Sequence, residues 1–287
     1  MQKLLAVAVM VLTCGTLRAQ TPCTEQNGCK SATADTGWFT SLNPSLNPSV
    51  TVSVVRQSEA DFISKTLYPA TVLLFSQDAM GTMKMLCTAT AISHDKGVYE
   101  FATASHCAAN DDKETHRAVV DKSLFFISSD KPNVKDFLEA KVEGCGMQTK
   151  GDDFCIFKVT TDKQFPVVAI GTDTTDDTEQ VVNVASPLGL GKQTFFGRVS
   201  RAQVDRSIQD DDNNINWTNA MLLQLPGTNG GSSGSAIVCL SQRAICGFLV
   251  GTVGKTTMVA IPISRFKKFR ELLATGKYKW YSTDDDE

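Results

Sequence analysis

The sequence predicts an all-β fold, built either as a pair of antiparallel barrels or as one long sandwich, with a single helix near the C-terminus. Short apolar or alternating runs separated by turn residues begin at about residue 70 and recur at close intervals. Such runs are typical of strands. They form two groups of about six, which suits closed or sandwiched antiparallel sheets. Only residues 263–274 have clear helical spacing instead.

The first 19 residues are predicted to be a secretory signal peptide. Lys3 precedes an apolar run at 4–12, and a cleavage site is expected near Ala19. The apolar run is too short to cross a bilayer. We therefore expect a secreted or periplasmic protein with no membrane partner once the signal has been removed.

Residues 20–60 form an N-terminal arm or a removed pro-segment, and the sequence leaves both alternatives open. The tetrapeptide Ser-Leu-Asn-Pro occurs twice, at 41–44 and 45–48, which indicates an extended, proline-punctuated segment. Cys23 and Cys29 are close enough in sequence to close a small loop within this arm.

The strand groups follow in order. The first group consists of residues 71–75, 84–92, 99–103, 123–127 and 154–159. The second consists of residues 167–170, 180–184, 196–199, 221–225, 235–238, 245–250 and 258–261. In the predicted helix, one face carries Phe266, Phe269, Leu272 and Leu273, and Gly276 suits a helix stop. Residues 276–287 are expected to be an acidic tail.

The composition is that of an ordinary globular protein. Of 287 residues, 42% are hydrophobic and 21% are charged. The net charge of −3 provides no basic footprint, so nucleic acid is not an expected partner. The sequence does not indicate an oligomeric state.

The cysteine count indicates disulfides rather than a metal site. Nine cysteines are present, and removal of the signal peptide with Cys14 leaves an even number. An exported chain of this kind favours disulfide bonds. No Cys-x-x-Cys pair and only three histidines are present, so we predict no metal and no cofactor.

The segment 227–236 contains the arrangement Gly231-Ser-Ser-Gly234. It suits a sharp turn that exposes a hydroxyl beside convergent peptide N–H groups, which are the two needs of an acyl-transfer site. Glycine- and serine-rich runs on their own are more often flexible loops. The interpretation therefore depends on finding a base and an acid elsewhere in the chain.

His106 and Asp153 are the candidate base and acid. His106 follows an apolar strand and precedes Cys107, whereas His94 and His116 lie in polar sequence and are expected to be exposed. Asp153 stands at the start of an apolar alternation, which favours it over the neighbouring Asp152.

These segments resemble the catalytic blocks of the chymotrypsin-fold (trypsin-like) serine proteases. Residues 103–107, 153–158 and 231–236 occur in the order His, Asp, Ser that this family has. Residues 184–191, 196–200, 247–250 and 259–263 are similar to segments of the bacterial Deg/high-temperature-requirement proteases. The resemblance covers roughly residues 65–270, and with about 15 residues after it we expect no PDZ domain to follow.

The resemblance implies a protease domain at 61–275. It would contain two six-stranded antiparallel Greek-key barrels, at about 65–160 and 165–265, with the active site in the cleft between them and the short helix at the end. The implied activity is a serine endopeptidase that cleaves protein or peptide substrates through an acyl-enzyme. A catalytically inactive homologue that serves as a secreted binding module is the alternative.

The resemblance also implies roles for individual residues. Ser233 would attack the scissile carbonyl, His106 would accept its proton, and Asp153 would orient the histidine, while the N–H groups of Gly231 and Ser233 would form the oxyanion hole. Ser232 and Ser235 are the neighbouring alternatives to Ser233. Digestive relatives carry an aspartate where Ser232 stands, so no activating pair with a new N-terminus is expected here.

The specificity pocket and the disulfides follow from the same resemblance and from placement. Gly227 would lie at the pocket base, and Thr228 would also belong to the pocket. No carboxylate is available at the base to bind Lys or Arg, so small or apolar P1 residues are expected. Val250, Gly251 and Thr252 would form one wall. The expected disulfides are Cys87–Cys107, beside the histidine as in the family, Cys145–Cys155, Cys239–Cys246 and Cys23–Cys29.

Overall fold

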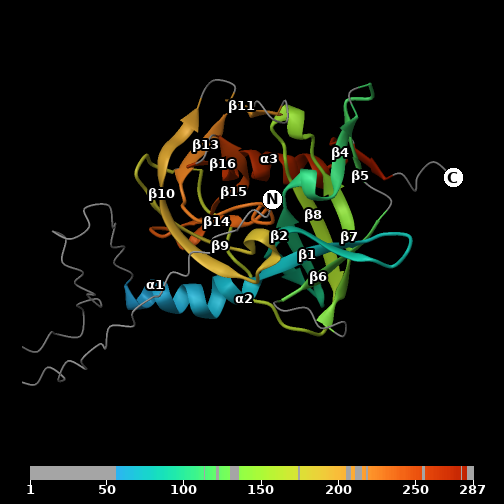
Figure 1. Cartoon of the computed structure of the whole chain (residues 1–287), viewed down its shortest axis with the longest axis horizontal. Helices are drawn as coiled ribbons and strands as arrows, with labels where there is room; N and C mark the ends of the chain where they lie inside the picture. Colours follow the sequence, from blue (N-terminus) through green and yellow to red (C-terminus); the bar gives the residue numbers. More distant parts are fainter. Residues whose placement is uncertain are drawn as a thin grey trace, which may run out of the picture.

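The computed structural model describes residues 56–282, apart from 113, 121–122, 130–135, 174, 205–207, 211–214, 218, 254–255 and 279. Within this part, two closed antiparallel barrels stand side by side (Figure 1). The predicted all-β fold is confirmed, and two barrels rather than one sandwich are observed. The predicted Cys23–Cys29 pair lies outside the described residues.

The first barrel has six strands in the order β1-β2-β3-β8-β7-β6. β1 to β3 are neighbours joined in sequence order, and β6 returns beside β1, which is the Greek-key arrangement. The strands are β1 (Thr71–Gln77), β2 (Met83–Asp95), β3 (Val98–Thr103), β6 (Leu124–Ser128), β7 (Leu138–Cys145) and β8 (Cys155–Thr160).

The second barrel repeats this strand order, since β9, β10 and β13 are followed around the barrel by β16, β15 and β14. Its interior is lined by apolar side chains that are almost fully buried, among them Val199, Leu223 and Ile237. The strands are β9 (Gln180–Ala185), β10 (Gln193–Val204), β13 (Ala220–Gln224), β14 (Ala236–Cys239), β15 (Ala244–Val253) and β16 (Thr257–Pro262).

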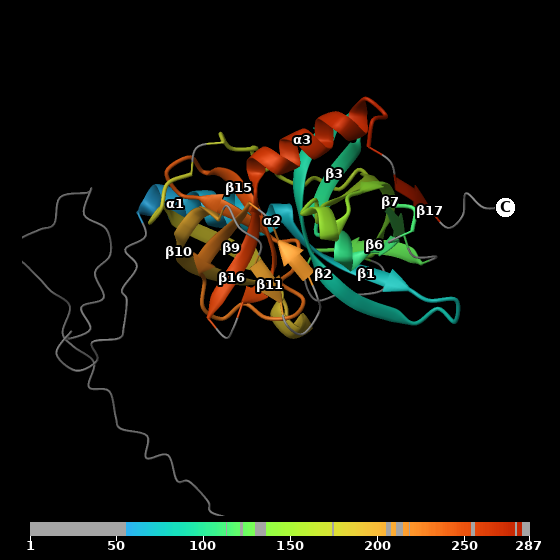
Figure 2. The ribbon, with the colours of Figure 1, turned by 90° about the horizontal axis from the view of Figure 1, so that it is seen from above.

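The helix α3 (Ile263–Ala274) has the bounds that the sequence predicts and lies across both barrels (Figure 2). Phe266 and Phe269 are buried, and their rings contact the ring of Phe154 from the first barrel at centroid distances of 5.2 and 5.8 Å. Phe154 also contacts Phe248 of β15. This aromatic cluster joins the two barrels next to the loop that carries Asp153.

Several segments differ from the sequence-based expectation. Residues 57–70, of which 57–60 were assigned to an irregular arm, form α1 (Gln57–Phe62), η2 (Ile63–Leu67) and α2 (Tyr68–Ala70). Residues 167–170 make only an isolated bridge between Ile170 and Ile245. β7 was missed because its charged residues, Glu139, Lys141 and Glu143, lower the apolar content of an alternating run.

Smaller elements complete the fold: η3 (Ser105–Cys107), β4 (Ala109–Asp112), β5 (Arg117–Val120), η5 (Gln148–Lys150), η6 (Pro187–Gly189), β11 (Ile208–Asp210), β12 (Ile215–Trp217) and β17 (Trp280–Ser282). β17 pairs in parallel with β5, so the segment expected to be a tail contributes a strand. No helix within the described ranges has the length and apolar character that a membrane span requires.

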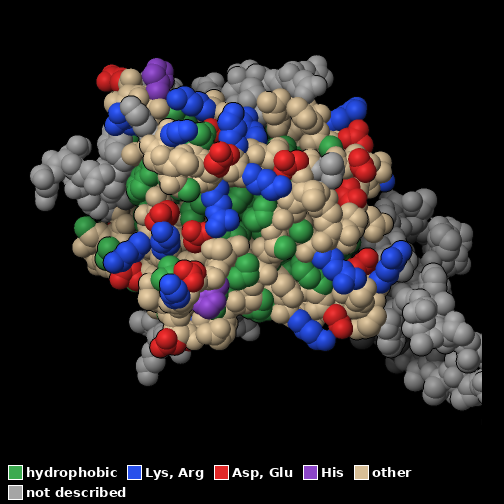
Figure 3. Space-filling view, turned by 180° about the vertical axis from the view of Figure 1, so that it is seen from behind, with side chains coloured by type: hydrophobic (Ala, Val, Ile, Leu, Met, Phe, Trp, Pro, Cys, Tyr) green, Lys and Arg blue, Asp and Glu red, His purple; other side chains and the backbone are tan. Residues whose placement is uncertain are grey.

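Charged side chains of both signs are interspersed over the face seen from behind (Figure 3). Figure 3 shows no extended area of Lys and Arg on that face, as expected from the slightly negative net charge.

Candidate active site

His106 and Asp153 are held together by two hydrogen bonds. The imidazole Nδ1 lies 2.8 Å from Oδ2 of Asp153, and the backbone N–H of His106 donates to Oδ1 at 2.9 Å. The carboxylate is fully buried, whereas 28% of the His106 side chain is exposed. His106 lies in η3, which follows β3 after Ala104, and Asp153 lies two residues before the first residue of β8, which pairs with β3. His94 and His116 are exposed, as predicted.

This pairing changes the proton affinity of the histidine. Burial is the largest single influence and lowers the pKa of His106, while the charge of Asp153 and its hydrogen bond raise it. The two contributions of Asp153 together prevail, so the pKa of His106 lies above its ordinary value. The bond to Nδ1 leaves Nε2 as the nitrogen that can accept a proton from a nucleophile.

The loop that carries Asp153 is anchored from the C-terminal side of the chain. Asp152 pairs with Arg265 of α3 at 2.9 Å, and the hydroxyl of Tyr278 donates to the other oxygen of Asp152 at 3.1 Å. The same hydroxyl accepts from the N–H of Met147 at 3.1 Å. Burial, and then the charge of Asp152, raise the pKa of Tyr278, which therefore remains a neutral donor.

The loop between β13 and β14 brings Ser233 beside the histidine segment. The carbonyl of Ser233 accepts from the N–H of Thr88 on β2 at 3.0 Å. Thr88 adjoins Cys87, which forms a disulfide with Cys107 next to His106. The backbone of Gly234 lies against Thr103 and Ala104, directly before η3. The structure thus places the loop with Ser233 and the segment with His106 in direct contact.

The three serines of this loop differ in their surroundings. Ser232 and Ser235 are 1% and 0% exposed. The hydroxyl of Ser232 accepts from the N–H of Asn229, and the hydroxyl of Ser235 donates to the carbonyl of Ser232. Ser233 is only partly buried, and its hydroxyl has no hydrogen-bond partner among the residues that the structure describes. Ser233 is therefore the serine whose hydroxyl is available for chemistry.

The peptide groups of the loop are held mainly through their carbonyls. Those of Gly230, Gly231, Ser232 and Ser233 each accept a hydrogen bond from another residue. The N–H groups of Gly231 and Ser233 have no acceptor within the described part of the chain. Two free donors two residues apart, next to an accessible hydroxyl, are what an oxyanion hole needs.

Gly234 is required by the close approach of the two barrels. An added Cβ would lie 2.5 Å from the N of Ala104 and 2.6 Å from the carbonyl O of Thr88, and closer still to the Thr103 hydroxyl. Its φ of +79° also disfavours any side chain.

We expect Gly234→Ala to lower the free energy of unfolding by about 2–4 kcal/mol and to displace Ser233, as measured by urea denaturation and enzymatic assay. Gly230→Ala is the matched control in the same loop, because a Cβ there meets no atom within 4 Å. Equal stabilities of the two variants would contradict this account of the barrel contact.

The described residues contain three disulfides, Cys87–Cys107, Cys145–Cys155 and Cys239–Cys246. These are the pairs that the sequence predicts for this part of the chain. Within the described residues, one group of possible metal ligands is found, Cys87, His106 and Cys107. Its two sulfurs are joined in a disulfide and cannot act as thiolate ligands.

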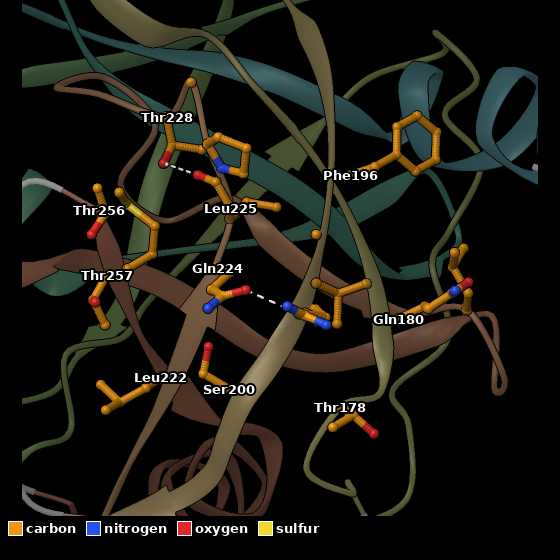
Figure 4. Close-up of a pocket in the computed structure, with 17 residues that line it drawn as sticks. Thr178, Gln180, Phe196, Ser200, Leu222, Gln224, Leu225, Thr228, Thr256 and Thr257 are labelled. Atoms are coloured by element: carbon orange, nitrogen blue, oxygen red, sulfur yellow. Dashed lines mark hydrogen bonds between the residues drawn. The ribbon is translucent and has the colours of Figure 1, made fainter. Parts of the chain in front are cut away.

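The predicted specificity-pocket residues separate into two sets. Gly227 and Thr228 line a cavity of about 820 Å³ on the second barrel, together with side chains of β10, β13 and β16 (Figure 4). Val250, Gly251 and Thr252 lie at the end of β15 and do not line this cavity. The ionised side chain that lines the cavity is that of Arg198, which donates a hydrogen bond to Gln224 at 2.9 Å. No carboxylate is among the lining residues of the cavity.

Comparison with known proteins agrees with this geometry. Residues 87–247 match the family described as trypsin-like peptidase domain. No curated protein matches the chain.

The solved structures that are similar to the chain include two of one HtrA-type protease and one of a second protease. These three are the HtrA-type protease AlgW with a decapeptide (15% identity, TM-score 0.56, covering 76% of this chain and 68% of that chain), AlgW with a tripeptide (16%, 0.55, 76% and 64%), and the serine endoprotease from Yersinia pestis (18%, 0.54, 77% and 68%). The chain spans 64–68% of their lengths.

At these identities the structural likeness shows the fold alone, which the chain shares with HtrA-type proteases. The family match carries the identification, because it covers more than half of the chain. The chain belongs to the trypsin-like peptidase family and is a serine endopeptidase of the chymotrypsin fold.

Proposed function

We propose that the chain is a secreted serine endopeptidase that uses Ser233, His106 and Asp153 as its catalytic triad. The observation that carries the proposal is the fully buried carboxylate of Asp153, which binds both the ring and the backbone of His106. That arrangement fixes the tautomer and the orientation of the imidazole, which is the role of the acid in such a triad.

In the proposed reaction, the Ser233 hydroxyl attacks the scissile carbonyl while Nε2 of His106 takes its proton. The negative charge that develops on the carbonyl oxygen is stabilised by the free N–H groups of Gly231 and Ser233. His106 then returns the proton to the leaving amine, and an acyl-enzyme remains. Water then attacks the acyl-enzyme while His106 takes a proton from it. His106 returns this proton to the oxygen of Ser233 as the acid product leaves.

Secretion and peptide substrates have separate support. Three disulfides within one domain suit an oxidising compartment and agree with the predicted signal peptide at 1–19. Two of the similar structures hold a decapeptide or a tripeptide, and we extend peptide substrates to this chain by analogy.

Labelling with a fluorophosphonate probe tests this function. We expect covalent labelling of the folded, secreted protein, with the adduct mapped by mass spectrometry to Ser233 and absent after heat unfolding. Absence of labelling in well-folded protein would contradict an active site and would favour the binding-module alternative. An adduct on Ser232 or Ser235 would contradict the assignment of the nucleophile.

The P1 preference is expected to be for small or apolar residues, because no carboxylate lines the cavity at Gly227 and Thr228. Cleavage of a peptide library measures it. Thr228→Asp would place a carboxylate in the cavity and should raise cleavage after Arg and Lys by about tenfold or more. Strong Arg or Lys preference in the unmodified enzyme would contradict this assignment of the pocket.

A further inference from the structure

Thr88 occupies a central position between the first barrel and the Ser233 loop. It lies within β2, and its side chain is fully buried. Its hydroxyl donates to the carbonyl of Gly231 at 2.8 Å and accepts from the N–H of Ser186 at 3.1 Å. Its backbone N–H donates to the carbonyl of Ser233, as described above. The side chain of Thr88 thus joins β2 to two loops, the one that carries Gly231 and Ser233 and the one that carries Ser186.

The carbonyl of Gly231 belongs to a different peptide group from its N–H. A peptide group is planar and trans, so holding a carbonyl also directs the N–H of the same group. The N–H of Gly231 is directed by the carbonyl of Gly230, which accepts from the N–H of Leu188 at 2.6 Å. The Thr88 hydroxyl holds the next peptide group, whose N–H, that of Ser232, donates to Asn229 at 2.9 Å. Gly231 is therefore fixed from both sides.

The Thr88 hydroxyl also holds the loop that contains Leu188. Ser186 directly precedes η6, and its N–H donates to the same oxygen that donates to Gly231. Leu188 has a φ of +55°, which is uncommon for a bulky side chain, and is 65% exposed. Gly231 has a φ of +91°, and a Cβ there would lie 2.6 Å from the carbonyl O of Ser186. Two segments with left-handed backbone conformations, of which that of Leu188 is unfavourable, thus meet at one hydroxyl.

We propose that Thr88 is a positioning residue for the oxyanion hole. Its hydroxyl holds Gly231 and the Ser186–Leu188 segment in the arrangement that directs the N–H of Gly231 toward the charge that develops on the substrate. Thr88 itself does not contact the substrate. The proposal rests on the proposed function and adds to it the group that preorganises its electrostatic site.

The chain provides a matched control for this role. Thr90 lies two residues further along β2, is equally buried, and its hydroxyl has no hydrogen-bond partner among the described residues. Thr88→Val and Thr90→Val remove the same atom from the same strand, and only the first removes hydrogen bonds. Thr88→Ser retains the hydroxyl and should retain its two bonds.

The experiment compares kcat and KM of these variants on a peptide substrate, at temperatures below each measured Tm. We expect Thr88→Val to lower kcat by roughly 10- to 100-fold with KM little changed, since the loss concerns the transition state. Thr88→Ser should restore most of kcat, and Thr90→Val should match the wild type. If Thr88→Val does not fold, Thr88→Ala makes the same comparison, because it also removes the hydroxyl and its two hydrogen bonds.

An unchanged kcat in folded Thr88→Val, a change confined to KM, or an equal loss in Thr90→Val would each overturn the proposal. Failure of the wild type to react with the fluorophosphonate probe would instead refute the proposed function. The two failures are therefore distinguishable.

Discussion

Ser233→Ala is expected to lower kcat/KM by about 10⁶-fold and to leave the thermal stability almost unchanged. The loss is large because the whole covalent pathway depends on this hydroxyl. Stability should not change, since that hydroxyl has no partner among the described residues and the side chain is partly exposed. Steady-state cleavage of a peptide substrate and a thermal melt of the same sample measure both effects.

The neighbouring serines are the controls. Ser232→Ala and Ser235→Ala each remove a buried hydroxyl that is hydrogen-bonded within the loop. They should lower Tm more than Ser233→Ala does and should lower activity far less. The assignment fails if cleavage survives in Ser233→Ala, or if Ser232→Ala alone abolishes it.

Asp153→Asn is expected to slow acylation by roughly 10⁴-fold near neutral pH. The asparagine fills the same space, but it lacks the charge that stabilises the imidazolium and can favour the wrong tautomer of His106. The rate constant of fluorophosphonate labelling measures this effect. Asp152→Asn is the matched control, because the side chain of Asp152 binds Arg265 and Tyr278 rather than His106. Comparable losses in the two variants would refute the specific role of Asp153.

The pH profile should change in a defined direction. Asp153 raises the pKa of His106, and the histidine must be neutral to act as a base. Labelling of the wild type should therefore rise with pH through a midpoint above about 6.5. In Asp153→Asn the midpoint should move to lower pH. By linkage, the stability contributed by the pair is fully present below the pKa of unfolded histidine and is lost as pH rises through the higher, folded pKa.

Periodicity and residue type made most of the fold predictable. The helix α3 was assigned from Phe266 and Phe269, which recur on one face and are buried in the structure. β7 was not predicted, since its outward charges obscured the apolar alternation. The Ile170 segment was expected to be a strand from its apolar run, but it makes only one bridge to β15. Apolar runs signal burial, and burial alone does not specify strand pairing.

The candidate site was predictable where its chemistry needs particular residue types. His106, Asp153 and Ser233 were identified from short motifs, and the two hydrogen bonds between His106 and Asp153 are present. Thr88 was missed because a threonine in an apolar strand has no sequence signal of its own. Its role depends on the carbonyl of Gly231, which its hydroxyl reaches only when the two barrels are docked. The contacts of Arg265 and Tyr278 with Asp152 were not predicted for the same reason, since these residues are distant from Asp152 in the sequence.

The contacts between Thr88 and the Ser233 loop have a consequence for how activity appears during folding. His106 and Asp153 belong to the first barrel, while Ser233 and its oxyanion donors belong to a loop of the second. A nascent chain with only its N-terminal barrel folded would lack Ser233, and it would also lack Arg265 and Tyr278, which anchor the loop of Asp153. On the proposed function, hydrolytic activity therefore requires both barrels and the C-terminal segment to be folded, and a half-folded chain cannot digest its own unfolded remainder.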